Sequence, residues 1–319
     1  MSDNPEKKAP RKPLIKWQKP NVGVIYALIP ASIASIYFFG WRSLLVIAVV
    51  SLAGFIAEFT FLKFYFKEPV TSAVFVTSLL FSLSMPPTIP LWIAVVGIVF
   101  GVVIGKMAFG GFGRNVFNPA LTGRAFIYIS FGSFMTARWV SPIETGFPGG
   151  FCKFAADSIT RATPIRILAA GKKIPLLDLM LGNVSGCLGE TSAILLIIGG
   201  IYILYKKYAN YRIVFSGIIS MLILQSVLWL GGVKGAPDPL SALLSGGFLL
   251  GILFMATDPV SASQTNTGRW IYGIIIGSIT VLIRTFSIWP EGIMFAILFG
   301  NMFAPIIDYS IKNARTAKS

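Results

Sequence analysis

Long apolar runs separated by short polar segments make up most of the chain. An apolar run of about 18 or more residues is a candidate membrane span, because about 20 helical residues cross the hydrocarbon core of a bilayer. The pattern predicts about ten spanning helices, at roughly 22–40, 43–65, 70–85, 90–109, 117–135, 191–206, 212–230, 239–256, 270–288 and 292–310. The third run is short and is followed by Pro86 and Pro87, which predicts a tilted or partly re-entrant segment.

A long polar interval, residues 136–190, divides these runs into two groups of five. An odd number of spans reverses the orientation of the second group, so the pattern predicts two inverted five-helix halves. The predicted fold is therefore an all-α polytopic integral membrane protein. Its predicted parts are a basic tail, a first transmembrane half, an outer loop, a second half and a short tail, at residues 1–21, 22–135, 136–190, 191–310 and 311–319.

Composition and charge favour the same class. The chain is 55% hydrophobic and only 12% charged, whereas soluble domains carry roughly 25% charged residues. The net charge of +15 comes from cations at the amino terminus and in alternate short loops. This positive-inside pattern predicts cytoplasmic termini and an extracytoplasmic 136–190 loop in the cell membrane. It explains the basic charge by the lipid bilayer, without a nucleic-acid partner.

The supply of metal ligands is small. The chain has two cysteines, Cys152 and Cys187, and no histidine. An iron–sulfur cluster usually takes four thiolates, and haem or catalytic zinc usually takes histidine. We therefore predict no metal site, and any redox chemistry would need an organic cofactor. Both cysteines lie in the outer interval, where a disulfide between them is an open alternative.

The polar interval contains the motif Asp-x-x-Thr-x-Ala-Thr, formed by Asp157, Thr160, Ala162 and Thr163 and followed by Pro164. Small polar residues before a proline are ordinary turn and cap formers, so the motif alone also fits a loop. Residues 164–182 then alternate apolar and basic positions and predict a short amphipathic helix on the membrane surface, broken by Pro175.

Three further polar segments lie beside apolar runs. Residues 110–126 read GGFGRNVFNPALTGRAF, residues 255–269 begin MATDPVSAS, and residues 290–308 begin PEGIMFAIL. Taken singly, each fits a loop with helix caps, and an amide such as Asn301 within a span commonly joins helices. Glycines four residues apart predict close helix packing: Gly97, Gly101 and Gly105, and Gly273 and Gly277. Acids near spans are candidates for an ion path: Glu58, Asp258, Glu291 and Asp308.

In this order, the four segments resemble the RnfD and NqrB family of membrane flavoproteins, over residues from about 40 to 310. The resemblance implies that Thr163 carries FMN through a phosphoester bond. It also implies that Asp157, Thr160 and Ala162 complete the motif recognised by a separate flavin transferase. Arg161 stands where many members have glycine. A noncovalent riboflavin is implied near Asn115 and Asn118.

The resemblance implies an electron-transfer subunit without catalytic residues of its own. As RnfD, the chain would belong to a translocase that couples ferredoxin:NAD oxidoreduction to Na⁺ or H⁺ movement, with the ferredoxin and NAD sites on partner subunits. The alternative is the equivalent subunit of the Na⁺-translocating NADH:quinone oxidoreductase. The length favours RnfD, while the third and fourth segments read closer to NqrB. A fold of this kind also suits a cofactor-free channel or secondary transporter.

Overall fold

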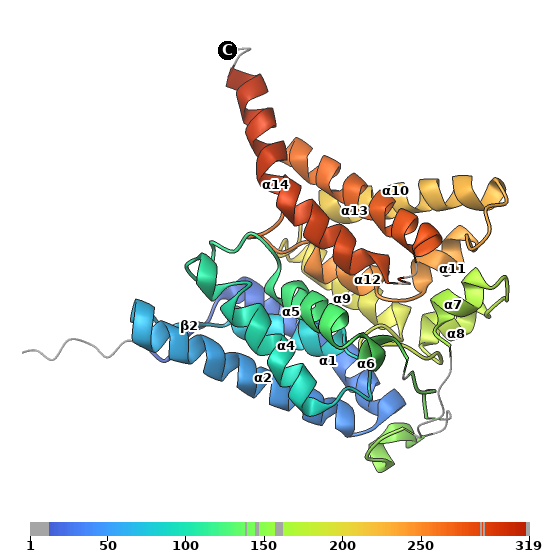
Figure 1. Cartoon of the computed structure of the whole chain (residues 1–319), viewed down its shortest axis with the longest axis horizontal. Helices are drawn as coiled ribbons and strands as arrows, with labels where there is room; N and C mark the ends of the chain where they lie inside the picture. The colour runs from blue at the N-terminus through green and yellow to red at the C-terminus, as the bar shows by residue number, and fades with distance from the viewer. Residues whose placement is uncertain are drawn as a thin grey trace, which may run out of the picture.

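The computed structural model describes residues 13–137, 139–143, 147–156, 162–287, 289 and 291–316. Most of these residues are helical and very few form strands, which confirms the all-α membrane class. The described strands are β1 (Ile15–Lys16) and β2 (Val70–Thr71), which pair in parallel, Ile15 with Val70 and Lys16 with Thr71. Figure 1 shows the earlier and the later helices of the chain as two groups packed against each other.

Six helices among the described residues are long and apolar enough to cross a membrane. They are α1 (Lys19–Phe39), α2 (Arg42–Phe61), α4 (Leu91–Val103), α10 (Tyr211–Leu230), α13 (Asn266–Phe286) and α14 (Gly292–Thr316). Short turns η1 (Leu62–Phe66) and η2 (Met107–Phe109) extend α2 and α4. Two shorter apolar helices, α3 (Ala73–Leu83) and α9 (Ala193–Tyr205), accompany them.

The remaining two of the ten predicted spans are interrupted. Residues 117–135 form α5 (Pro119–Ser130) and α6 (Gly132–Thr136), with a break at Phe131. Residues 239–256 form α11 (Pro239–Leu244), α12 (Phe248–Leu250) and the π-helix η4 (Gly251–Met255). The chain turns at residues 245–247, where Gly246 has a φ of 64° that a residue with a side chain rarely adopts. At these two predicted spans the helix is therefore discontinuous.

The packing order of the helices is the same in both halves. In the first half, α2 packs on α3 and α4, and α4 packs on α5. In the second half, α10 packs on α11 and α13, and α13 packs on α14. Across the halves, α1 contacts α9 and α5 contacts α14, so the elements in equivalent positions meet each other. The buried core runs through both halves as one cluster of apolar side chains.

The glycines predicted to pack closely do so. A side chain on Gly101 of α4 would overlap the carbonyl oxygen of Pro119, and one on Gly123 of α5 would overlap the backbone at Gly97. In the second half, a side chain on Gly277 of α13 would overlap the backbone of α10. Small residues at these positions allow the helix backbones to approach each other.

The polar interval contains two short helices instead of the one amphipathic helix predicted at 164–182. They are α7 (Pro164–Ala169) and α8 (Leu176–Leu181), and a further turn, η3 (Gly149–Cys152), precedes them. Gly171, with a φ of 78°, ends α7, and Pro175 begins α8. Figure 1 shows α7 and α8 beside α11. The apolar side chains of α8 at Leu177 and Leu181 remain exposed, as a surface helix would leave them.

Candidate functional site

Thr163 stands immediately before α7, with an extended backbone (φ −67°, ψ 154°). A threonine at this position usually accepts a hydrogen bond from the first turn of its helix. Here the side chain makes no such bond, and its Oγ1 is buried without a hydrogen-bond partner among the described residues. A buried hydroxyl left unpaired costs about 1–3 kcal/mol. The described part of the chain thus makes no use of this oxygen, which fits a hydroxyl reserved for a covalent attachment.

The rest of the predicted attachment motif is only partly placed. Ala162 is exposed beside Thr163. Asp157 and Thr160, together with Arg161, lie outside the described residues. Their recognition by a flavin transferase stays a prediction.

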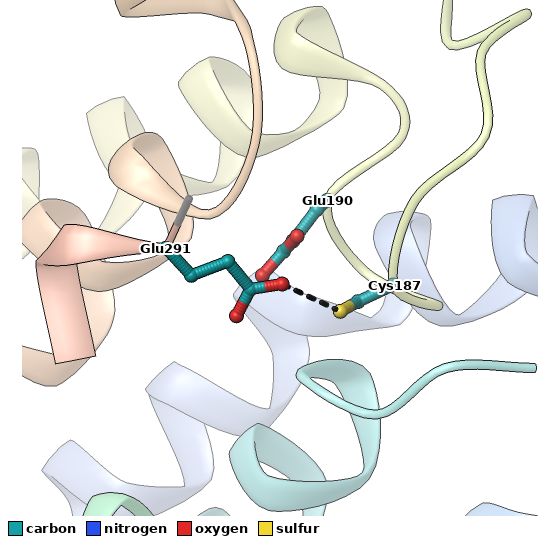
Figure 2. Close-up of side chains that lie close together, drawn as sticks. All are labelled: Cys187, Glu190 and Glu291. Atoms are coloured by element: carbon teal, nitrogen blue, oxygen red, sulfur yellow. Dashed lines mark hydrogen bonds between the residues drawn. The ribbon is translucent and has the colours of Figure 1, made fainter. Parts of the chain in front are cut away.

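A buried cluster of charged groups lies where the two halves meet. Arg124 of α5 pairs with Glu291, the residue before α14, and its Nη1 lies 3.7 Å from Oε1 of Glu190. The Sγ atom of Cys187 lies 3.5 Å from Arg124 Nη2 and 3.8 Å from Glu291 Oε1. Figure 2 shows the side chains of Cys187, Glu190 and Glu291 converging from two separate segments.

The turn at residues 245–247 connects this cluster to α7. Ile165, two residues after Thr163, packs against Gly246, and Glu190 packs against Gly247. Arg284 of α13 holds the same turn by donating to the carbonyl oxygens of Ala242, at 2.8 Å, and Ser245, at 3.2 Å. The turn at residues 245–247 therefore contacts both the start of α7, next to Thr163, and Glu190 of the charge cluster.

Burial sets the protonation of the groups that the loop before α9 contributes. Burial is the main cause that raises the pKa of Glu190 to about 7, and the carboxylate of Glu291 is the second. Burial also raises the pKa of the Cys187 thiol well above its ordinary value. The ligand-type atoms of Cys187, Glu190 and Glu291 lie within 4.8 Å of one another. Arg124 supplies a positive counter-charge to the two carboxylates. As folded, the cluster is an ion-pair network.

Sequence reasoning finds only part of this cluster. It indicates Glu291 as an acid near a span, and Cys187 only as half of an open disulfide. The structure has both cysteines as free thiols, Cys152 exposed and Cys187 buried. Arg124 and Glu190 were missed. An arginine inside a predicted span is the signal that could have identified the site, because such a charge is costly without partners.

A cavity lined by residues of both halves contains the two asparagines expected near a riboflavin. Its walls include Lys106, Phe112, Asn115, Asn118 and Asp258. Its volume is about 80 Å³, well below the ~300–1,000 Å³ of small-molecule sites. The cavity is therefore narrow, and the riboflavin assignment stays a prediction.

Asn118 itself is engaged in the fold. Its Oδ1 caps α5 by accepting from Ala120 N at 3.0 Å, and its Nδ2 donates to Met255 O of η4 at 3.1 Å. Its backbone N donates to Asn301 Oδ1 of α14 at 3.2 Å, and Asn301 Nδ2 donates to Tyr272 Oη at 2.7 Å. This network joins the halves, which confirms Asn301 as a connection between helices. Asn115 Nδ2 donates locally, to Phe117 O at 3.0 Å.

The remaining acids near spans also have structural partners. Glu58 is fully buried and lies 2.6 Å from Lys106 Nζ. Asp258 accepts from Val260 N at 3.0 Å and from the Ser261 hydroxyl at 3.1 Å, which fits a turn-forming aspartate. Asp308 of α14 accepts from the backbone N of Gln264 at 2.6 Å and of Thr265 at 2.9 Å. Their role in an ion path stays a prediction.

Comparison with known proteins finds a family model and curated relatives that match the chain. A family model described as the NQR2, RnfD, RnfE family matches residues 12–317. Curated relatives include the NqrB subunit of the Na(+)-translocating NADH-quinone reductase from three organisms. The Yersinia pestis protein is 42% identical over 84% of this chain and 65% of its own length. The Ectopseudomonas mendocina protein is 41% identical over 93% of this chain and 74% of its own length. The Azotobacter vinelandii protein is 44% identical over 78% of this chain and 62% of its own length. The chain thus spans about two thirds of the length of these relatives.

Proposed function

Because the chain belongs to the NQR2, RnfD and RnfE family, we propose that it is the membrane electron-transfer subunit of a Na⁺-translocating NADH:quinone reductase. The observation that carries this proposal is 41% identity, along 93% of the chain, to an NqrB subunit of that complex. The relatives thus favour the alternative over the RnfD interpretation that the length suggested. NADH and quinone chemistry, and the Na⁺ pump, then involve other subunits of the complex.

The proposal includes FMN on Thr163. A flavin, when bound, accepts and releases electrons singly or in pairs. Attachment would transfer FMN from FAD to Oγ1 of Thr163 on a flavin transferase. The bond between the two phosphates of FAD breaks, a new phosphoester bond forms on Oγ1, the threonine proton is released and AMP leaves. The supporting observation is the buried Oγ1 that lacks a partner among the described residues.

The chain's own residues would then position the tether. Pro164 fixes the start of α7, and the packing of Ile165 against Gly246 holds α7 on the second half. Arg284 fixes that turn through the carbonyl oxygens of Ala242 and Ser245. A tether on this helix keeps its cargo at one place on the protein, so that electrons arrive and leave over fixed distances.

Flavin fluorescence of the denatured protein tests the proposal. The full chain is expressed with a flavin transferase, separated on a denaturing gel and viewed under ultraviolet light. We expect a fluorescent band for the unaltered protein and a dark band for Thr163→Val. This variant keeps the shape of the side chain, and the fold should tolerate it because Oγ1 has no partner among the described residues.

Two further results define what would contradict the proposal. A dark band for the unaltered protein, with a transferase shown to be active on another substrate, would favour the cofactor-free channel. Fluorescence that survives Thr163→Val would place the attachment elsewhere. In membranes carrying the whole complex, Na⁺-stimulated quinone reduction by NADH should be lost with Thr163→Val. Activity with ferredoxin in place of quinone would return the chain to the RnfD interpretation.

A further inference from the structure

A cleft with two lysines opens at the end of α10, where α7, α8 and α11 meet, and we propose that it binds an anionic phospholipid. We call it the basic cleft; its lining includes Leu168, Lys172, Lys173, Leu176, Trp229 and Ser241. Its volume is about 530 Å³, within the ~300–1,000 Å³ of small-molecule sites. It is separate from the charge cluster and from the cavity at Asn115.

Hydrogen bonds fix the walls of the basic cleft. At the end of α7, Gly171 N donates to Leu168 O at 2.9 Å and Lys172 N donates to Ile167 O at 3.2 Å. This pair of bonds is a glycine-dependent helix end, which sets the direction in which the chain leaves α7. Opposite it, Asp238 caps α11 by accepting from Ser241 N at 2.8 Å. The cleft is therefore shaped by the backbone before any ligand arrives.

The basic cleft lies at a membrane surface. α10 is a candidate span of 20 residues, and Trp229 stands in its last turn, 48% exposed. Tryptophan side chains gather at the boundary between lipid and water. The end of a span and an interfacial tryptophan place the cleft at the depth of the lipid headgroups, whichever side of the membrane that is.

The charge of the basic cleft suits a phosphodiester. Lys172 and Lys173 are exposed and bring two positive charges. The single acid in the lining, Asp238, already uses its carboxylate to cap α11. The cleft therefore has a net positive charge, and lysines near a membrane surface attract anionic headgroups.

An apolar track leads from the basic cleft along α10. Its exposed side chains recur at helical spacing on one face: Ile219, Ile223, Val227 and Leu230. The 11 residue-to-residue steps from Ile219 to Leu230 rise about 16 Å at ~1.5 Å per step, close to one leaflet of a ~30 Å hydrocarbon core. The track thus matches an acyl chain in length, and it ends at Leu230, next to Trp229 in the lining of the basic cleft. Headgroup site and acyl track together fit one phospholipid.

Lipid binding to the purified full chain tests this inference. The probe is phosphatidylglycerol, added to detergent-purified protein and counted by native mass spectrometry, with phosphatidylcholine as the neutral lipid. We expect one retained phosphatidylglycerol and a roughly 20- to 30-fold weaker Kd in Lys172→Ala/Lys173→Ala, because each lysine near the surface adds a severalfold attraction. Lys172→Arg/Lys173→Arg should keep the binding.

The control is Lys206→Ala/Lys312→Ala, which removes two exposed lysines outside the cleft. This pair should leave the retained lipid in place. Equal loss in both double variants would show nonspecific charge attraction and overturn the inference, as would unchanged binding in Lys172→Ala/Lys173→Ala. Equal retention of phosphatidylcholine, or displacement of the lipid by millimolar inorganic phosphate, would also overturn it. So would a crosslink in the assembled complex that joins Lys173 to another subunit with no lipid present.

Discussion

The ion pair between Arg124 and Glu291 should be a main connection between the two halves of the molecule. Arg124 belongs to α5 of the first half and is 2% exposed, and Glu291 precedes α14 of the second half and is 5% exposed. The informative perturbation is Arg124→Leu. It fills a similar apolar volume and leaves Glu291 and Glu190 with Arg284 as the nearest other cation that acts on both.

The expected effect is large because the remaining charges stay buried. Removing one partner of a buried ion pair typically costs about 3–5 kcal/mol, whereas replacing both partners by apolar residues is often neutral. We therefore expect Arg124→Leu to lower the free energy of unfolding by about 3–5 kcal/mol. The double variant Arg124→Leu/Glu291→Leu should recover part of that loss, since only Glu190 then remains near the vacated position.

Unfolding of the purified chain by SDS in mixed micelles, followed by tryptophan fluorescence, measures this difference. Arg315→Leu is the matched control, because Arg315 is exposed in the last turn of α14 and should change stability by less than about 0.5 kcal/mol. If Arg124→Leu were as stable as the control, the ion pair would not hold the halves together. A double variant whose loss equals the sum of the losses in Arg124→Leu and Glu291→Leu would show that the two side chains act independently.

Three smaller predictions follow from the same packing. Gly101→Ala should cost about 1–3 kcal/mol in SDS unfolding, because the new methyl group meets the backbone of α5, while Gly132→Ala, in open space, should cost nothing measurable. Asn301→Leu should cost about 1–3 kcal/mol by leaving Asn118 N and Ser261 O unpaired. An unchanged midpoint of SDS unfolding would show that this hydrogen-bond network does not stabilise the fold. The folded pKa of Glu190, about 7, lies above its ordinary 4.5, so the contribution of Glu190 to stability is full below about pH 4.5 and is lost as pH rises through 7. Between pH 5 and 8 the melting temperature should therefore fall less in Glu190→Gln than in the unaltered protein. An equal fall in both proteins would contradict the raised pKa of Glu190.

Much of the fold follows from apolar run length. The spans at α1, α2, α10, α13 and α14 are long, apolar and bounded by polar loops, so their positions could be predicted. The break at residues 245–247 could not, because glycine is common within membrane helices. Only the three-dimensional packing shows that Gly246 adopts a positive φ there.

The candidate site, like the fold, could be predicted from the sequence only in part. A local motif indicates Thr163, yet its unpaired hydroxyl depends on how α7 packs. Arg124 and its partners Glu190 and Glu291 are distant along the chain, so no spacing rule brings them together. Asn118 before Pro119 has the local signature of a helix start, and the structure gives it that role together with contacts to the other half.

Tandem mass spectrometry of the peptide that contains Thr163 tests the central claim most directly. The protein is taken from membranes of cells that also make the flavin transferase, digested, and fragmented to locate any added mass. The proposed attachment predicts one FMN phosphoester on Thr163 and an unmodified peptide from Thr163→Val. An unmodified Thr163 in the assembled, active complex would contradict it.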